Sequence, residues 1–346
     1  ITQPQTAKLI VDYSVTGRVL ALRSLDGERI DFTYDRQGNV VSQTVKRSNG
    51  SVTQSMQQSF DALGRLLSTT LGVGRPQRFQ YDKEGNVTML TDPRDLTSTL
   101  GLDALGRVIS STHPDGGVEA STYNKRDEAV SFTDAIDVTT TFVRNGFGEV
   151  IREVSPDRGT STYYYDAAGR MTAEIDGRGQ RIDYGYDIAG RLLSKTPVGR
   201  PASETVLYTY DGTGSGGGLG GYQTGRLTSM SDGSGTTRFG YDHRGNLIER
   251  QQVLGSTAAA SLTYTYDLAD RITGIGYPSG RTVRYGYDGK GRVASVETRA
   301  SATAAWVTLA GNMSYQPFGA VESMALGNGL AVANDRGFDG RLRART

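Results

Sequence analysis

Tyrosine, aspartate and arginine recur in this sequence at a spacing that could support acid–base chemistry. Tyr165, Asp166 and Arg170 place a phenol, a carboxylate and a guanidinium within six residues, with Gly169 before the arginine. Such groups act as general acids and bases when their surroundings adjust their pKa values. The same spacing returns along the whole chain, however, and a fixed period indicates a structural unit, not a single catalytic centre. The other clear copies are Tyr34, Asp35 and Gly38; Tyr81, Asp82 and Gly85; Tyr186, Asp187 and Gly190; Tyr241, Asp242 and Gly245; and Tyr287, Asp288 and Gly291.

The remaining reactive residue types do not form a site. His113 precedes a proline in a predicted turn, and His243 occupies a variable position of a repeat turn. Neither has a partner at the spacing of a metal site or a nucleophilic triad. The sequence has no cysteine, which excludes disulfides and thiolate metal ligands. We therefore predict no catalytic residue, no metal site and no cofactor.

A glycine-rich insertion at residues 212–221 interrupts the repeat. A phosphate-binding loop would need a strand before it, a helix after it and usually a lysine. The chain continues instead into Tyr222–Arg226, which resembles the start of another strand. We predict a surface loop.

The repeated residues are those of a β-hairpin turn. Asp at the first position and Gly at the fourth are typical of a type I turn, and the carboxylate accepts a backbone N–H about two residues on. Gly169 is then expected in the left-handed conformation of a bulge. Asp127 and Asp270 replace this glycine in two repeats, and aspartate tolerates positive φ better than most residues. The flanking segments 160–165 and 171–175 are rich in strand-forming residues.

A second kind of turn joins each hairpin to the next. Two turns in each 21-residue period leave roughly six residues for each strand, a typical strand length. About fifteen hairpins predict about thirty strands, and open sheets rarely pass ~10 strands without curling. We predict an all-β fold in which tandem hairpins form a long antiparallel sheet, coiled into a spiral, hollow shell or arc. Residues 1–346 are expected to form one such array, truncated at both ends. The turns that join one hairpin to the next lie at residues 114–117, 156–159, 176–179, 232–235 and 278–280.

The repeated side chains have two expected uses. The tyrosines before the turns are expected to line up as a ladder of cross-strand aromatic pairs. The alternative is an exposed row of rings, including Tyr184 and Tyr285, that stacks on sugars. The arginine after each glycine could pair with the turn aspartate of an adjacent repeat, a contact of small individual value.

The net charge, the apolar runs and the N-terminal residues limit the expected functions and partners. With 38 basic and 37 acidic residues the net charge is +1, so nucleic acid and anionic membranes are not expected partners. No apolar run approaches the ~20 residues of a membrane helix. The chain starts at Ile1 without a Met or a signal segment, so we expect it to be cut from a longer protein.

The Tyr-Asp-x-x-Gly-Arg/Asn formula at this period resembles the RHS, or YD-repeat, family over essentially the whole chain. The resemblance implies a β-ribbon coiled into a hollow shell around a variable C-terminal toxin domain. Insecticidal toxin-complex C components and type VI secretion effectors have such shells, and the animal teneurins share them. It also implies a secreted or cell-surface bacterial protein, whose partners would be the rest of the shell, the enclosed toxin and a secretion apparatus.

One feature departs from the family pattern. RHS shells usually end in a self-cleaving segment with an Asp-Pro-x-Gly motif, whereas Asp92-Pro93 here is followed by Arg94 and Asp95 at an early joining turn. The resemblance therefore predicts a non-catalytic shell segment without its cargo. The alternative hypothesis is a carbohydrate-binding module that uses exposed tyrosine rows.

Overall fold

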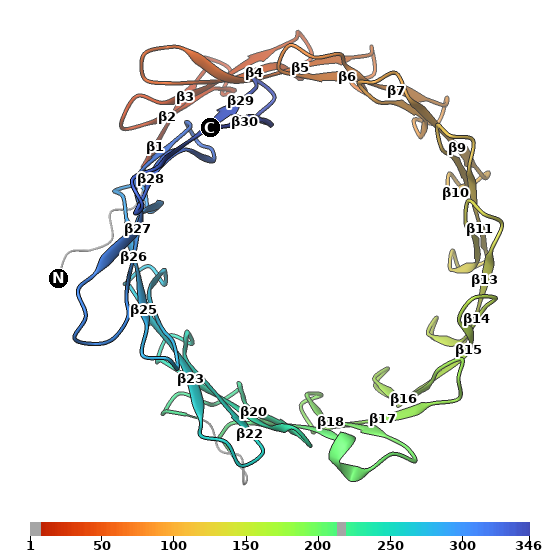
Figure 1. The fold of residues 1–346 in the computed structure, drawn as a ribbon. Helices are drawn as coiled ribbons and strands as arrows, with labels where there is room; N and C mark the ends of the chain where they lie inside the picture. Colours follow the sequence, from red (N-terminus) through yellow and green to blue (C-terminus); the bar gives the residue numbers. More distant parts are fainter. Residues whose placement is uncertain (1–7, 213–218) are drawn as a thin grey trace. The chain divides into compact units, whose positions relative to one another are not determined.

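The computed structural model describes residues 8–212 and 219–346, which form β-strands joined by short turns (Figure 1). Thirty strands and one 3-10 helix, η1 (Ala202–Glu204), lie in these residues. The chain divides into two compact units. Unit 1 comprises Ile1–Gly117, Arg284–Thr298 and Ala305–Thr346, and unit 2 comprises Val118–Val283 and Arg299–Ala304.

Unit 1 contains strands from both ends of the chain. The first ten are β1 (Leu9–Tyr13), β2 (Val19–Ser24), β3 (Arg29–Tyr34), β4 (Val40–Lys46), β5 (Val52–Phe60), β6 (Leu66–Leu71), β7 (Gln77–Tyr81), β8 (Val87–Thr91), β9 (Thr97–Leu102) and β10 (Val108–Thr112). The last five are β26 (Val293–Arg299), β27 (Val307–Tyr315), β28 (Val321–Leu326), β29 (Ala331–Arg336) and β30 (Leu342–Arg345). Strand β25 (Thr282–Tyr287) crosses the boundary between the units, and β26 ends one residue beyond it.

Unit 2 contains the middle of the repeat array. Its strands are β11 (Val118–Tyr123), β12 (Ala129–Thr133), β13 (Thr139–Arg144), β14 (Val150–Ser155), β15 (Gly159–Tyr165), β16 (Met171–Ile175), β17 (Arg181–Tyr186), β18 (Leu192–Pro197), β19 (Val206–Tyr210), β20 (Leu227–Asp232), β21 (Gly235–Tyr241), β22 (Leu247–Leu254), β23 (Ala260–Tyr266) and β24 (Ile272–Gly276). No helix in the described part of the chain is long and apolar enough to cross a membrane.

Within each unit, consecutive strands pair in the antiparallel direction, as in β15 with β16 and β16 with β17. The register shifts where a strand enters a repeat turn, for example between Tyr164 and Tyr165, which marks the predicted bulge. The predictions of an all-β fold and of consecutive antiparallel hairpins are confirmed.

Few side chains are fully buried. In residues 8–212 and 219–346, the buried apolar residues are Ala21, Val45, Ala173, Val283, Ala310 and Pro317. Most strand residues are half-buried against their neighbours. Stability therefore depends on contacts between adjacent repeats more than on a central core, as is usual for repeat proteins.

Candidate functional site

The repeat turn is built as the sequence predicted. The Gly169 N–H donates to the Asp166 carbonyl at 3.0 Å, and the Asp166 N–H donates to the Arg170 carbonyl at 3.0 Å. Gly169 has φ +78°, which is the left-handed region. Oδ1 of Asp166 accepts the N–H groups of Ala168 and Arg170 at 2.9 and 3.0 Å. Asp127 and Asp270 have φ +62° and +59° at the glycine position, so these substituted turns keep the same geometry.

The turn carboxylates are held in their ionised form. The Arg170 guanidinium, together with the backbone amides of Arg170 and Ala168, lowers the pKa of Asp166 below its ordinary value. A carboxylate stabilised in this way is a weak base and does not carry a proton at neutral pH. The recurring aspartates therefore serve the turns, with no sign of the raised pKa that a general acid needs.

Several repeat arginines contact two repeats at once. Nε of Arg170 donates to Oδ2 of Asp166 in its own turn at 2.7 Å, and Nη1 donates to the Asp187 carbonyl of the next turn at 3.2 Å. Arg191 also reaches the carboxylate of the next repeat, at 2.7 Å from Oδ2 of Asp211. The predicted pairing with an adjacent aspartate is thus found at Arg191, which also binds Asp187 of its own turn, whereas Arg65 pairs with its own turn aspartate, Asp61.

The repeat tyrosines are tied to the preceding repeat. The Tyr186 hydroxyl donates to the Met171 carbonyl at 2.8 Å, 15 residues earlier in the chain. At these positions the neighbour of the ring is an arginine from the preceding repeat, not the second tyrosine that the sequence predicted. Arg170 lies over the Tyr186 ring, with Cζ 5.1 Å from the ring centroid. The same hydroxyl bond is made by Tyr34 to Val19, Tyr81 to Leu66 and Tyr165 to Val150.

The tyrosine row offers little free ring surface for sugars. Tyr34, Tyr81, Tyr165, Tyr186, Tyr241 and Tyr287 are all half-buried. The Tyr184 hydroxyl donates to Oε1 of Glu174 at 2.7 Å. Burial is the main cause that raises the pKa of Tyr184, and the hydrogen bond to Glu174 is the second. Tyr285 is half-buried as well.

The two histidines lie in turns, as the sequence predicted. The His113 backbone closes a joining turn with Gly117 at 2.8 Å, and His243 lies edge-on to Tyr222 with ring centroids 6.0 Å apart. No group of three side chains that could hold a metal ion occurs in the described residues. Asp92 caps its turn by accepting the N–H groups of Arg94 and Leu96. The predicted loop at 212–221 lies mostly outside the described residues, because 213–218 are not among them.

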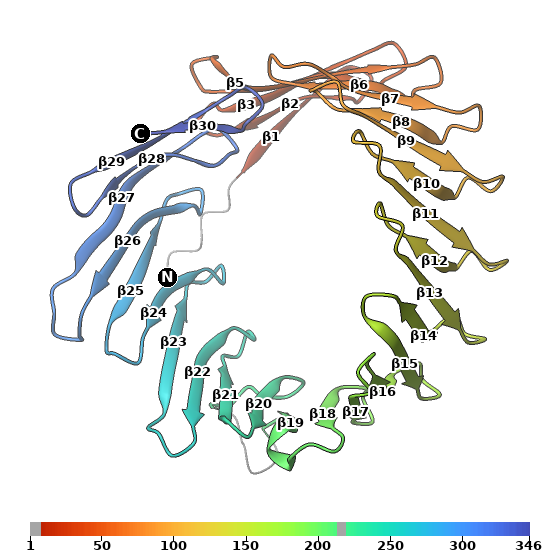
Figure 2. The same cartoon turned by 45° about the vertical axis from the view of Figure 1, so that its right-hand side comes forward.

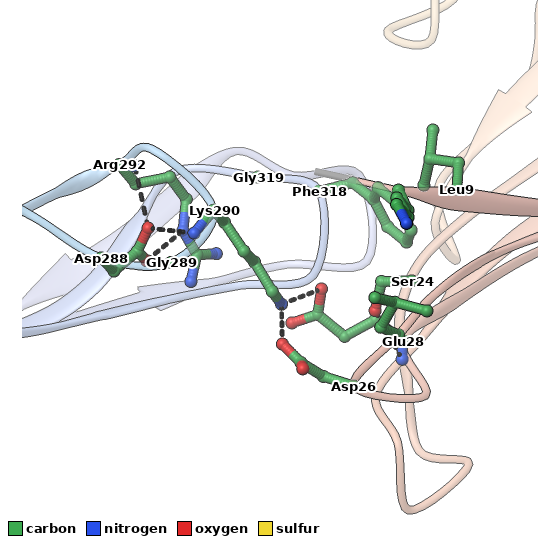
Figure 3. Close-up of a pocket in the computed structure, with 12 residues that line it drawn as sticks. Leu9, Ser24, Asp26, Glu28, Asp288, Gly289, Lys290, Arg292, Phe318 and Gly319 are labelled. Carbon is green, nitrogen blue, oxygen red and sulfur yellow. Dashed lines mark hydrogen bonds and ion pairs between the residues drawn. The ribbon is translucent and has the colours of Figure 1, made fainter. Parts of the chain in front are cut away.

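A seam in unit 1 brings the last hairpins of the chain against the first ones. Nζ of Lys290, in a repeat turn, lies 2.8 Å from both Oδ2 of Asp26 and Oε2 of Glu28, in the turn between β2 and β3 (Figure 3). Further along, the Ser55 N–H of β5 donates to the Phe338 carbonyl at 2.9 Å. The β29–β30 hairpin accordingly lies near the first strands of the chain (Figure 2), with its turn against β5. These contacts join residues more than 260 positions apart, and no periodic signal in the sequence identifies them.

A cavity of about 610 Å³ opens beside this ion pair. Leu9, Leu25 and Phe318 line its apolar part. Two of its three cations are already paired, since Lys290 binds the two carboxylates and Arg292 binds Asp288 at 2.8 Å. The seam is therefore better explained as a structural contact than as a ligand site.

Comparison with known proteins places this geometry in a family. Residues 18–214 and 221–305 match the family model of the teneurin YD-shell. The chain belongs to the teneurin YD-shell family. The YD-shell chain is also 30% identical over 138 residues to the probable deoxyribonucleases RhsA and RhsB of Dickeya dadantii (strain 3937). Each match covers 38% of this chain and only 9% of the relative, so the YD-shell chain corresponds to a small part of those proteins.

Solved structures share the fold of the YD-shell chain. The crystal structure of TcdB2-TccC3-Cdc42 matches 99% of this chain and 20% of the solved chain, with a TM-score of 0.76 at 13% identity. The structure of the Photorhabdus luminescens Tc holotoxin pore matches 97% and 20%, also with a TM-score of 0.76 at 13% identity. At this identity the likeness concerns the fold alone.

Proposed function

We propose that this YD-shell chain is a non-catalytic wall segment of an RHS-type toxin, and that the wall encloses a C-terminal toxin domain before delivery. The observation that carries the proposal is the use of the repeated groups. Asp166 caps its turn, Arg170 bridges to the next repeat, and the Tyr186 hydroxyl bonds to the preceding one. Side chains that make these structural contacts hold the wall together and do not serve as catalytic groups.

The relatives support the same assignment. Two are named as probable deoxyribonucleases, and the matched region is 9% of their length. We assign any nuclease activity of those proteins to parts outside the matched region. The partners of this chain would then be the remainder of the same shell and the enclosed domain, exported together from a bacterium by a toxin-delivery system.

The test is protection of the enclosed domain in the full-length parent protein. Limited trypsin digestion should leave the C-terminal domain intact as long as the wall is closed. Lys290→Met removes both ion pairs to Asp26 and Glu28, so it is expected to speed cleavage of that domain. Lys83→Met, at an exposed repeat turn, is the matched control and should leave the rate unchanged. A C-terminal domain that trypsin cleaves rapidly in the parent protein itself would contradict enclosure.

The carbohydrate-binding alternative receives less support from this geometry, because the repeat tyrosines are half-buried and several of their hydroxyls are bonded. A glycan array would favour it if binding were found and then lost in Tyr184→Ala and Tyr285→Ala.

A further inference from the structure

Repeat tyrosines in this chain are regularly covered by a guanidinium from the preceding repeat. The covering group is the arginine that directly follows the turn glycine, and its Cζ lies between 4.3 and 5.7 Å from the ring centroid. A cation over an aromatic face is attracted by the negative charge density of the ring. The pairs are Arg18 with Tyr34, Arg65 with Tyr81, Arg170 with Tyr186, Arg191 with Tyr210, Arg226 with Tyr241, and Arg292 with Tyr315.

Tyr165 breaks this rule because the residue after its preceding turn glycine is Glu149. The ring is held as in the other repeats, since the Tyr165 hydroxyl donates to the Val150 carbonyl at 2.9 Å. Glu149 also occupies the place of the usual arginine, because its Oε1 lies against Gly169 as Arg170 lies against Gly190. A carboxylate thus stands where other repeats have a guanidinium.

The preceding repeat also has a glutamate in place of the arginine, and there the chain supplies a cation nearby. There Glu128 occupies the arginine position, but the following tyrosine position holds Arg144. Nε of Arg144 donates to the Ala129 carbonyl at 3.1 Å, which is the contact that a tyrosine hydroxyl makes elsewhere. Glu128 is therefore followed at the next tyrosine position by a cation, Arg144. Glu149 is followed at that position by Tyr165.

Glu149 has no cation of its own. In the part of the chain that the structure describes, no lysine or arginine nitrogen lies within 4.0 Å of its carboxylate. Its Oε2 accepts one hydrogen bond, from Nδ2 of Asn145 at 2.6 Å. Burial, then the Glu149 carboxylate and Tyr163, raise the pKa of Tyr165, and Arg144 acts on it in the opposite direction with the smallest effect.

A cavity of about 680 Å³ opens at this position in unit 2, along β13, β14 and β15. Its lining includes Tyr165, Glu149 and two exposed aromatic residues, Phe147 and Tyr164. Phe147 is 92% exposed and Tyr164 is 44% exposed, so both rings are accessible to a solute. Arg152 is the single cation among the lining residues, and its guanidinium does not reach the Glu149 carboxylate.

We propose that this cavity binds an organic cation, a guanidinium or alkylammonium group, beside Glu149 and against the Tyr165 ring, where the guanidinium of the longer arginine lies in other repeats. The aromatic rings supply the apolar walls, and Glu149 supplies the counter-charge. An arginine or lysine side chain of a partner protein and a free alkylamine share this chemistry. The proposal does not depend on the toxin-shell function, because it rests on an exchange within one repeat.

The experiment is a titration of the chain labelled with 4-fluorophenylalanine, in which Phe147→Leu assigns the Phe147 fluorine signal. N-acetyl-arginine methylamide and butylammonium are expected to shift this signal saturably, whereas the neutral isostere N-acetyl-citrulline methylamide is not. Glu149→Gln should weaken cation binding about tenfold, because one buried charge contact is lost. Glu149→Arg should abolish binding by restoring the internal guanidinium. Glu128→Gln, at the equivalent position of the preceding repeat, is the matched control and should bind as the parent chain does.

The source of the cation is resolved by two further ligands. Tighter binding of an N-acetyl-Gly-Arg-Gly amide than of agmatine indicates a side chain of a protein partner, and the reverse order indicates a free amine. Arg152→Ala should tighten binding, since it removes the one like charge from the lining. The proposal is overturned if neither cation gives a saturable shift, if the citrulline compound binds equally well, or if Glu149→Arg binds as tightly as the parent chain.

Discussion

Arg170 lies over the ring of Tyr186, with 5.1 Å from Cζ to the ring centroid, while its Nε stays bonded to Asp166. One side chain therefore connects the turn of its own repeat to the tyrosine of the next. The Tyr186 hydroxyl then bonds back to Met171, directly beyond Arg170 in the chain. Neighbouring repeats are thus cross-linked in both directions, which explains how an array with few buried residues holds its shape.

The first prediction concerns the tyrosine hydroxyl. Tyr186→Phe removes the bond to the Met171 carbonyl and leaves the ring in place, so it should lower the free energy of unfolding by about 0.5–1.5 kcal/mol. Tyr277→Phe is the control, because Tyr277 is 40% exposed and lies outside the repeat position. Denaturant unfolding followed by circular dichroism measures both. Equal stability of the two variants would show that the hydroxyl bond contributes nothing.

The second prediction concerns the left-handed glycine. Gly169→Ala forces a Cβ into φ +78° and against the Glu149 carboxylate, 3.0 Å away, so it should destabilise the chain by about 1–2 kcal/mol. Gly146→Ala is the matched control in the preceding turn, because Gly146 does not have positive φ and a Cβ there meets no atom within 4 Å. Thermal unfolding of the two variants should separate them clearly. A Gly169→Ala variant as stable as Gly146→Ala would contradict the strained geometry.

Local structure was predictable from the sequence because its causes are local. The Asp-to-Gly spacing specifies the turn, and the repeat period specifies the pairing of consecutive strands, so both agree with the structure. The neighbour of repeat tyrosines such as Tyr186 was predicted incorrectly as another ring, because an arginine covers that ring. The information was present, since Arg170 precedes Tyr186 by a spacing that recurs in Arg18 and Tyr34, but it becomes visible only when residue types are compared between successive repeats.

The seam could not be predicted for a different reason. Lys290 and Glu28 are separated by 262 residues, and no local pattern in the sequence links the two positions. Neither Lys290 nor Glu28 differs in residue type from the charged residues of other turns. The same limitation applies to the cavity at Tyr165, which arises from the exchange of one arginine for Glu149.

The third prediction concerns the seam within unit 1. Lys290→Met removes the contacts to Asp26 and Glu28, so backbone hydrogen exchange should accelerate in residues 24–28 and 288–291. Raising the salt concentration to about 1 M should produce part of the same effect in the parent chain, because these groups are partly exposed and screening shortens the Debye length to ~3 Å. Lys83→Met serves as the control. Unchanged exchange in Lys290→Met would mean that the ion pairs do not hold the seam.

The fourth prediction concerns acid. The pKa of Asp187 is lowered by the Arg191 backbone amide and then by the Arg191 guanidinium, from an ordinary value of 3.8. A carboxylate whose pKa is depressed in the folded state stabilises the fold above its unfolded pKa, and the stabilisation is lost as the pH falls through the folded value. The melting temperature should therefore decline below about pH 4, as protonation of such turn carboxylates becomes favourable in the unfolded chain.

Asp187→Asn should make this decline shallower, because asparagine keeps the acceptor without the charge. Asn145 already does so in its own turn, where Oδ1 accepts the Phe147 and Glu149 N–H groups at 2.9 and 3.1 Å. An acid profile that is identical in the parent chain and in Asp187→Asn would exclude this carboxylate as a source of the pH dependence.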